Sequence, residues 1–237
     1  MKILPLLIIA LMATNALYSQ QKFEIGLEGG PSIATMRGNS ILEERTTSRF
    51  GFLGGLSLQY NISKNIAIRS GIGFARKGAY SIDSFNIFDS TSGTFNSTGV
   101  LEICSDFDYI SIPLLMRFTF GNKKIKYFAN GGAYLTFLTK QLDRKSGTLV
   151  FASANDVDGT GNFNEIDYGL SLGLGARYSI SQKLDLSLEL RNDLGLSDIS
   201  ALPTFQNGGI KTSALNLLVG ISYGIGKDIS QNLESNL

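Results

Sequence analysis

The sequence predicts an all-β fold, namely an eight-stranded antiparallel up-and-down transmembrane β-barrel. Three features support it: apolar and polar residues alternate strictly, the alternation recurs in eight segments, and the connections alternate in length. The clearest segment is 166–180, where every even position is apolar and every odd position is small or polar. Successive strand side chains point to opposite faces, so this segment has one apolar and one polar face. Its 15 residues exceed the usual strand of about five or six, and roughly 9–11 tilted residues suffice to cross a bilayer.

Seven other segments repeat this alternation, and two of them contain irregular positions. The full set of predicted strands is 23–34, 49–62, 66–77, 109–120, 125–138, 166–180, 184–196 and 211–225. Pro113 falls on the polar face of its strand and removes one ladder donor, which predicts a bulge or kink. Phe128 and Tyr134 fall on the otherwise polar face of 125–138.

The connections between these strands alternate between tight turns and long loops. The tight turns are 63–65, 121–124 and 181–183, and the long loops are 37–48, 78–108, 139–165 and 195–210. Short turns at one end, long loops at the other and an even strand number are typical of bacterial outer-membrane barrels. The same strand number also occurs in soluble barrels. A soluble or peripheral barrel that binds a small hydrophobic ligand therefore remains the alternative.

Charged and aromatic residues favour the membrane barrel over this alternative. Nearly all charges within the strands lie on the polar face, as a narrow lumen of paired side chains requires: Glu24, Glu28, Asp167, Asp185, Glu189 and Asp193, with Arg49, Arg69, Arg117, Lys126, Arg177 and Arg191. Most strand glycines share that face, where side chains converge. The apolar-face aromatics gather at the turn end (Phe23, Tyr60, Phe118, Phe120, Tyr127, Tyr178, Tyr223) and at the loop end (Phe50, Phe52, Phe74, Phe137, Tyr168). Two such girdles are expected where a barrel meets both membrane interfaces.

The two ends of the chain differ in composition from the barrel. Residues 1–20 carry Lys2 followed by an apolar run and small residues, which predicts a signal peptide. Residues 21–226 form the predicted barrel domain, and 227–237 form a polar tail. Eight strands return the chain to its starting side, so we expect both termini to be periplasmic and the long loops to be extracellular. The net charge of +1 argues against a nucleic-acid partner.

Catalytic chemistry is poorly supported by the composition. The chain contains no His, the commonest general base in hydrolysis and acyl transfer. Asp185 and Glu189 share one strand face with Arg191, and we interpret them as a structural ion-pair network. No catalytic or cofactor-binding residues are predicted, and eight strands leave an interior just wide enough for side chains, which disfavours a diffusive pore.

Two loops are candidates for binding. Residues 156–167 partly match a calcium loop, with oxygen-bearing or glycine residues at Asp156, Asp158, Thr160, Gly161, Asn164 and Asp167. Position five of the calcium loop is Thr160, and position twelve is Asp167 instead of Glu. We therefore prefer a polar surface loop and leave calcium binding open. Loops 78–108 and 139–165 are candidates for contact with a protein partner, since loops often carry function. The apolar residues of the first could contact a partner or fold over the barrel mouth: Phe85, Ile87, Phe88 and Phe95.

The order of several short motifs resembles the PorT-like outer-membrane β-barrel family of Bacteroidetes-type bacteria. The motifs are F-E-I-G-L-E-G-G-P-S at 23–32, Y-I-S-I-P-L-L-M-R-F at 109–118, K-Y-F-A-N-G-G-A-Y-L at 126–135 and L-G-L-G-A-R-Y at 172–178. The resemblance covers about 22–226 and implies an integral outer-membrane barrel with no catalytic residues. The resemblance implies fold and location rather than an activity, although the family's named member is linked to a protein-secretion system. We expect a structural, adhesive or assembly role, of which a role accessory to such a system is one form.

Overall fold

The computed structural model describes residues 22–38, 40–89, 94–121, 124–147, 156–203 and 208–226. The predicted signal peptide at 1–20 and the predicted tail at 227–237 lie outside these ranges. The elements are β1 (Phe23–Arg37), α2 (Ser40–Arg45), β2 (Thr46–Asn61), β3 (Ile66–Asp89), β4 (Thr94–Phe120), β5 (Ile125–Gly147), β6 (Val157–Asp158), η2 (Thr160–Asn162), β7 (Ile166–Ser179), β8 (Leu184–Gly195) and β9 (Lys211–Ile225). Within the described ranges, no helix is long and apolar enough to cross a membrane.

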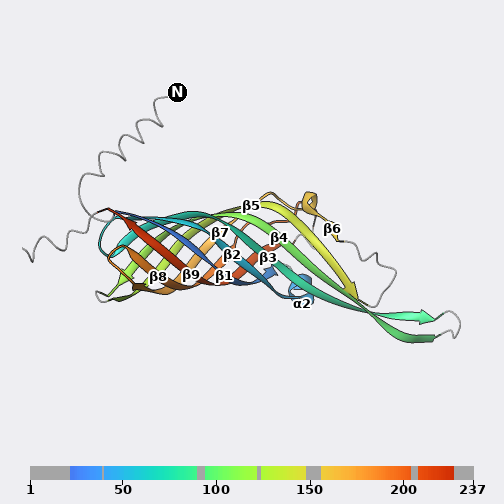
Figure 1. The fold of residues 1–237 in the computed structure, drawn as a ribbon. Helices are drawn as coiled ribbons and strands as arrows, with labels where there is room; N and C mark the ends of the chain where they lie inside the picture. The colour runs from blue at the N-terminus through green and yellow to red at the C-terminus, as the bar shows by residue number, and fades with distance from the viewer. Residues whose placement is uncertain are drawn as a thin grey trace, which may run out of the picture.

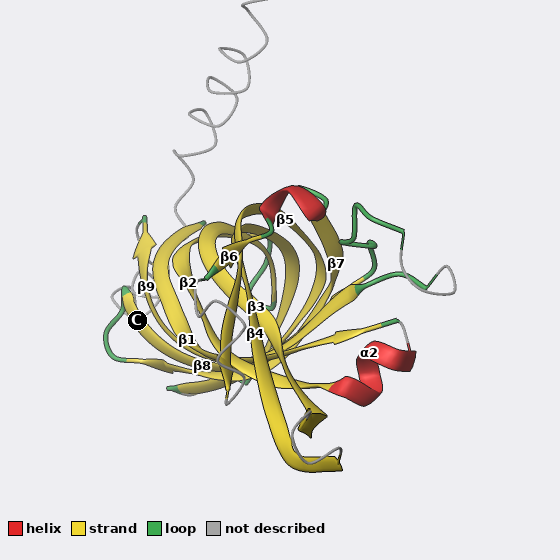
Figure 2. Ribbon diagram, turned by 90° about the vertical axis from the view of Figure 1, so that its right-hand side faces the viewer, coloured by secondary structure: helices red, strands yellow, loops and turns green. Residues whose placement is uncertain are grey.

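Eight long antiparallel strands close into a ring, which confirms the predicted fold class (Figures 1 and 2). Each strand pairs with its neighbours along the chain, and β1 also pairs with β9 from Phe23–Ile225 to Arg37–Lys211. The two-residue strand β6 adds to the edge of β5 and is not part of the ring. Closure satisfies the backbone polar groups of every strand within the ring, which is a requirement for a sheet that crosses lipid.

The predicted faces are confirmed along the central strand β7. Leu172 and Leu174 point outward and are 67% and 69% exposed, whereas Ser171 is 1% exposed and faces the lumen. Exposed apolar side chains cover the outer surface of all eight strands. A soluble barrel for a hydrophobic ligand would place such residues inside, so this apolar exterior indicates a membrane environment.

Aromatic residues mark both ends of the apolar surface. Phe23 and Tyr60 contact each other at the turn end, with ring centroids 5.1 Å apart. Phe52 and Phe74 stack at the loop end, with centroids 5.2 Å apart. These contacts lie at the positions predicted for two membrane-interface girdles.

The largest departure from the sequence prediction is the region 78–108, which is not a loop. Strands β3 and β4 continue through it and remain paired as far as Asp89 and Thr94. Figure 1 shows this hairpin projecting beyond the loop end of the barrel, so the alternative in which it folds over the mouth is wrong. β5 likewise continues to Gly147. The alternation weakens here because neither face of a strand outside the membrane has to be apolar.

Pro113 does not produce the predicted bulge. The β3–β4 pairing passes from Ser70–Leu114 to Gly73–Ser111 without a change of register, and it omits the intervening pairs at Pro113 and Ile112. Proline therefore interrupts the ladder locally, as expected from its missing N–H. The register shift between β4 and β5 lies instead at Asp108 and Tyr109.

Candidate functional site

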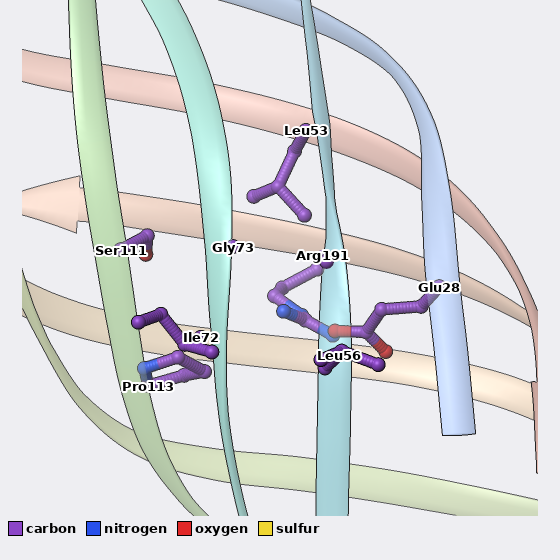
Figure 3. Close-up of a pocket in the computed structure, with 9 residues that line it drawn as sticks. Glu28, Leu53, Leu56, Ile72, Gly73, Ser111, Pro113 and Arg191 are labelled. Carbon is purple, nitrogen blue, oxygen red and sulfur yellow. The ribbon is translucent and has the colours of Figure 1, made fainter.

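The lumen contains ion pairs along its length, arranged in separate groups. At mid-height, Arg191 forms ion pairs with Glu189 (Nε–Oε1, 2.8 Å) and with Glu28 (Nη2–Oε1, 3.1 Å). Arg69 forms an ion pair with the other carboxylate oxygen of Glu28. Figure 3 shows Arg191 and Glu28 pointing toward each other across the lumen. Arg191 and Glu189 lie on β8, Glu28 lies on β1 and Arg69 lies on β3, so their pairing ties three strands of the ring together.

The predicted Asp185–Glu189 pair is divided between two separate ion-pair groups. Glu189 belongs to the mid-height network, where Arg117 also approaches it. Asp185 lies at the turn end, where Arg177 bridges it to Glu24, with 3.0 Å between Arg177 NH2 and Glu24 Oε1. Both carboxylates are engaged by guanidinium groups, as the structural ion-pair interpretation requires.

A third buried group lies at the loop end of the lumen and centres on Asp167. Lys77 Nζ lies 3.1 Å from Asp167 Oδ2, and Thr212 donates to the same oxygen at 2.8 Å. The Ser197 hydroxyl donates to Asp167 Oδ1 at 2.6 Å. Lys77 also lies over the ring of Tyr134, 4.5 Å from its centroid. The two aromatic residues that interrupt the polar face, Phe128 and Tyr134, thus cover lumen cations, since Arg117 stacks on Phe128 at 3.9 Å.

An apolar lid packs over this group at the loop end of the barrel. Its buried members are Met36, Ala79, Phe107, Tyr109 and Ile199, with Leu138, Phe163 and Ile210 packed against them. The connections before β7 and after β8 supply Phe163 and Ile199 and bond to each other: Asn164 N donates to Ile199 O at 2.8 Å, and Ala201 N donates to Asn162 O at 3.0 Å. Ile199 has no exposed surface. The lid separates the Lys77–Asp167 pair from external solvent.

A small cavity lies where Pro113 interrupts the β3–β4 ladder (Figure 3). It measures about 20 Å³, and its lining includes Gly73, Leu53, Glu28 and Arg191. A space of this size holds about one water molecule. The described lumen therefore offers no apolar pocket for a ligand at this point, and the side chains fill the interior as expected for eight strands.

Charged residues on the outer side of the loop end form a rim above the aromatic girdle. Asp106 adjoins Phe107, whose side chain lies inside, so Asp106 lies on the outer strand face. Arg49, which the sequence prediction assigned to the lumen, instead binds Asp106, and Arg144 NH1 approaches the same carboxylate at 3.2 Å. A register shift between Ser48 and Leu53 in β2 accompanies this change of side. Sequence reasoning missed the rim because its acidic residues lie in the region taken for a loop.

The calcium-like segment 156–167 does not assemble as a single site. Asp167 is buried in the lumen with Lys77, whereas Asp158 accepts hydrogen bonds from the Thr160 hydroxyl (2.6 Å) and backbone N–H (3.0 Å). These two bonds hold the pKa of the Asp158 carboxyl below its usual range. Among the described residues, no three His, Cys, Asp or Glu side chains are grouped as metal ligands.

The fold, the apolar exterior and the closed ionic lumen define a transmembrane β-barrel. The chain belongs to the outer membrane protein beta-barrel domain family, whose model matches residues 18–201. It is similar in fold to Neisserial surface protein A, with 16% identity, a TM-score of 0.50, and coverage of 88% of this chain and 99% of that one.

Two further solved structures align over most of the chain. One is the attachment invasion locus protein Ail of Yersinia pestis, with 13% identity, a TM-score of 0.43, and coverage of 86% of this chain and 99% of that one. The other is OprG of Pseudomonas aeruginosa, with 11% identity, a TM-score of 0.43, and coverage of 88% and 98%. No curated protein matches the chain.

Proposed function

We propose that the protein is an outer-membrane anchor that presents the β3–β4 hairpin to a protein partner outside the cell. The observation that carries this proposal is that β3 and β4 run as a paired hairpin far past the barrel body (Figure 1). Both termini are then periplasmic, and the connections between β5 and β7 and between β8 and β9 are extracellular. The role is structural, adhesive or assembly-related and not enzymatic.

The closed interior supports presentation over transport. Ion pairs fill the described lumen, and the Ile199 lid covers its loop end. A conducting pore would need these buried pairs to separate, and breaking one leaves uncompensated charge in the interior. The surface outside the barrel is therefore the part of the molecule available for interaction.

The resemblance to PorT-like barrels favours a partner that belongs to a protein-secretion system. The regions proposed to contact it are 78–108 and 139–165, together with the lipid that surrounds the barrel. The proposed partner is thus a component of a secretion system, and the identity of the proteins cross-linked to the hairpin tests this.

Site-specific photo-cross-linking on intact cells tests the proposal. A photoreactive residue at Ser84, in the projecting part of β3, should give protein adducts, whereas one at Leu172, on the lipid-facing wall, should give lipid adducts only. A shortened variant that joins Asp83 to Leu101 by an Asn-Gly turn removes the tip but keeps their register. Absence of protein adducts at Ser84, or the same adducts from other sites in the shortened variant, would contradict the proposal.

A further inference from the structure

The projecting part of β3 is paired on one side only. On the β2 side, pairing ends at Ser81, which lies opposite Thr46. On the β4 side, pairing continues for eight more residues, to Asp89. Within the described ranges, the contact near the start of this free edge is with α2, whose Arg45 lies 3.7 Å from Asp83. Among the described residues, no strand pairs with the rest of this edge, from Ile82 to Asp89.

The direction of the edge's hydrogen-bonding groups follows from the start of β3. Ile66 O accepts from Ile62 N (2.9 Å) on the β2 side, whereas Asn65 O accepts from Thr119 N (2.8 Å) on the β4 side. In an antiparallel sheet the N–H and C=O of one residue point to the same neighbour, and the direction alternates along the strand. β3 keeps this alternation, because the extra residues at the two register shifts lie in β2 and β4. Ser84 and Asn86 therefore direct their N–H and C=O to the open side.

The sequence of the hairpin lacks the usual protection against edge pairing. Residues 82–100 contain no Lys, Arg or Pro, and their charged residues are Asp83 and Asp89. Natural edge strands are commonly blocked by basic side chains, prolines or bulges on the edge itself. An open edge without them is a template on which another strand can pair by main-chain hydrogen bonds.

We propose that residues 82–89 of β3 bind an extended basic segment of a protein partner as an added β-strand. This inference rests on the anchor function proposed above and specifies how the partner is recognised. The edge of eight residues spans about 26 Å, which accommodates an ordinary strand of about five or six residues. The sequence of the hairpin is net negative, because residues 82–100 contain two Asp and no Lys or Arg, and this composition complements Lys or Arg in the partner. A second copy of the chain fits less well, because it would bring two such acidic edges together.

Amide hydrogen exchange of the full barrel in detergent micelles tests the proposal. The probe is a synthetic eight-residue peptide of alternating Thr and Val with Lys at both ends. We expect it to slow exchange at the Ser84 and Asn86 amides and to leave the amides that face β4 unchanged. Asn86→Pro removes the central edge donor and should weaken binding by about tenfold, whereas Asn86→Ala keeps the donor and should bind as the parent does.

Two results would overturn strand addition. One is the absence of protection at Ser84 and Asn86 at millimolar peptide, and the other is equal binding by Asn86→Pro and Asn86→Ala while the β4-facing amides show an intact hairpin. A peptide with Glu in place of Lys should bind more weakly, and equal binding would remove the assignment of a basic partner. Peptide binding in micelles does not depend on orientation in the cell, so a failure here is distinguishable from a failure of the cross-linking experiment.

Discussion

The barrel body and the projecting hairpin share two strands, β3 and β4, which meet opposite constraints in the two regions. Within the body, β3 is paired on both sides, its outer face is apolar, and its inner face carries Arg69 and Lys77 in buried ion pairs. Beyond Ser81, the same strand is paired on one side, and its sequence mixes Ile and Phe with Asp, Ser and Asn without sustained alternation. A sheet in lipid must close into a ring and must alternate apolar and polar side chains, whereas a sheet in water needs to do neither. The difference indicates that the closed body stabilises the protein, whereas the hairpin keeps one edge available to a partner.

The largest expected effect comes from breaking the Lys77–Asp167 pair in the body. Lys77→Met leaves the fully buried Asp167 carboxylate without its cation and should cost about 3–5 kcal/mol of unfolding free energy. The double variant Lys77→Met, Asp167→Leu should recover most of that loss. Urea unfolding in lipid vesicles measures both, and equal destabilisation by the single and double variants would show that the pair does not act as a unit.

A smaller effect is expected on the lipid-facing wall. Leu172→Arg places a charge at the middle of the apolar face and should cost about 2–4 kcal/mol. Ser171→Arg, one residue away, enters the lumen beside Asp193, so it should act through crowding and not through contact with lipid. Changing the hydrocarbon thickness of the vesicles should alter the penalty of Leu172→Arg alone. If both penalties respond alike, the two faces have been misassigned.

Most of the barrel body could be predicted from the sequence because the membrane imposes a period of two. The position of Leu172 outside and that of Glu189 inside both follow from alternation alone. The contacts within the lumen could not be predicted in this way. Alternation places Asp167 on the inner face, but the shear of the ring decides that it meets Lys77, which is 90 residues away.

The hairpin, the lid and the outer rim were the parts that sequence reasoning missed. A connection of 31 residues at 78–108 exceeds the roughly 12–15 residues usual for loops without structure, and this length was the available signal for the hairpin. Ile199 is buried against residues of β1, β3 and β4 that are distant in the sequence, so no local pattern marks it. Arg49 changes sides through a register shift in β2, which alternation cannot anticipate.

The smallest expected effect concerns the exposed turn at Asp158. Its depressed pKa means that the hydrogen bonds from Thr160 add stability above the usual Asp pKa of about 3.9 and lose it as the pH falls through the lower folded pKa. Thr160→Val should raise the Asp158 pKa toward its usual value, whereas Thr160→Ser should keep it low. Carboxyl-carbon NMR titration measures both, and an unchanged pKa in Thr160→Val would show that the hydroxyl does not stabilise the carboxylate.

Topology mapping on intact cells tests the central claim most directly, namely that the barrel spans the outer membrane with its hairpin and long connections outside. Protease added to intact cells should cleave within 139–165, which contains exposed Gly and Asp residues. An epitope placed after Leu237 should remain protected until the outer membrane is opened. Labelling of that epitope on intact cells, with no cleavage in 139–165, would contradict the orientation and the account of the hairpin as a surface for an extracellular partner.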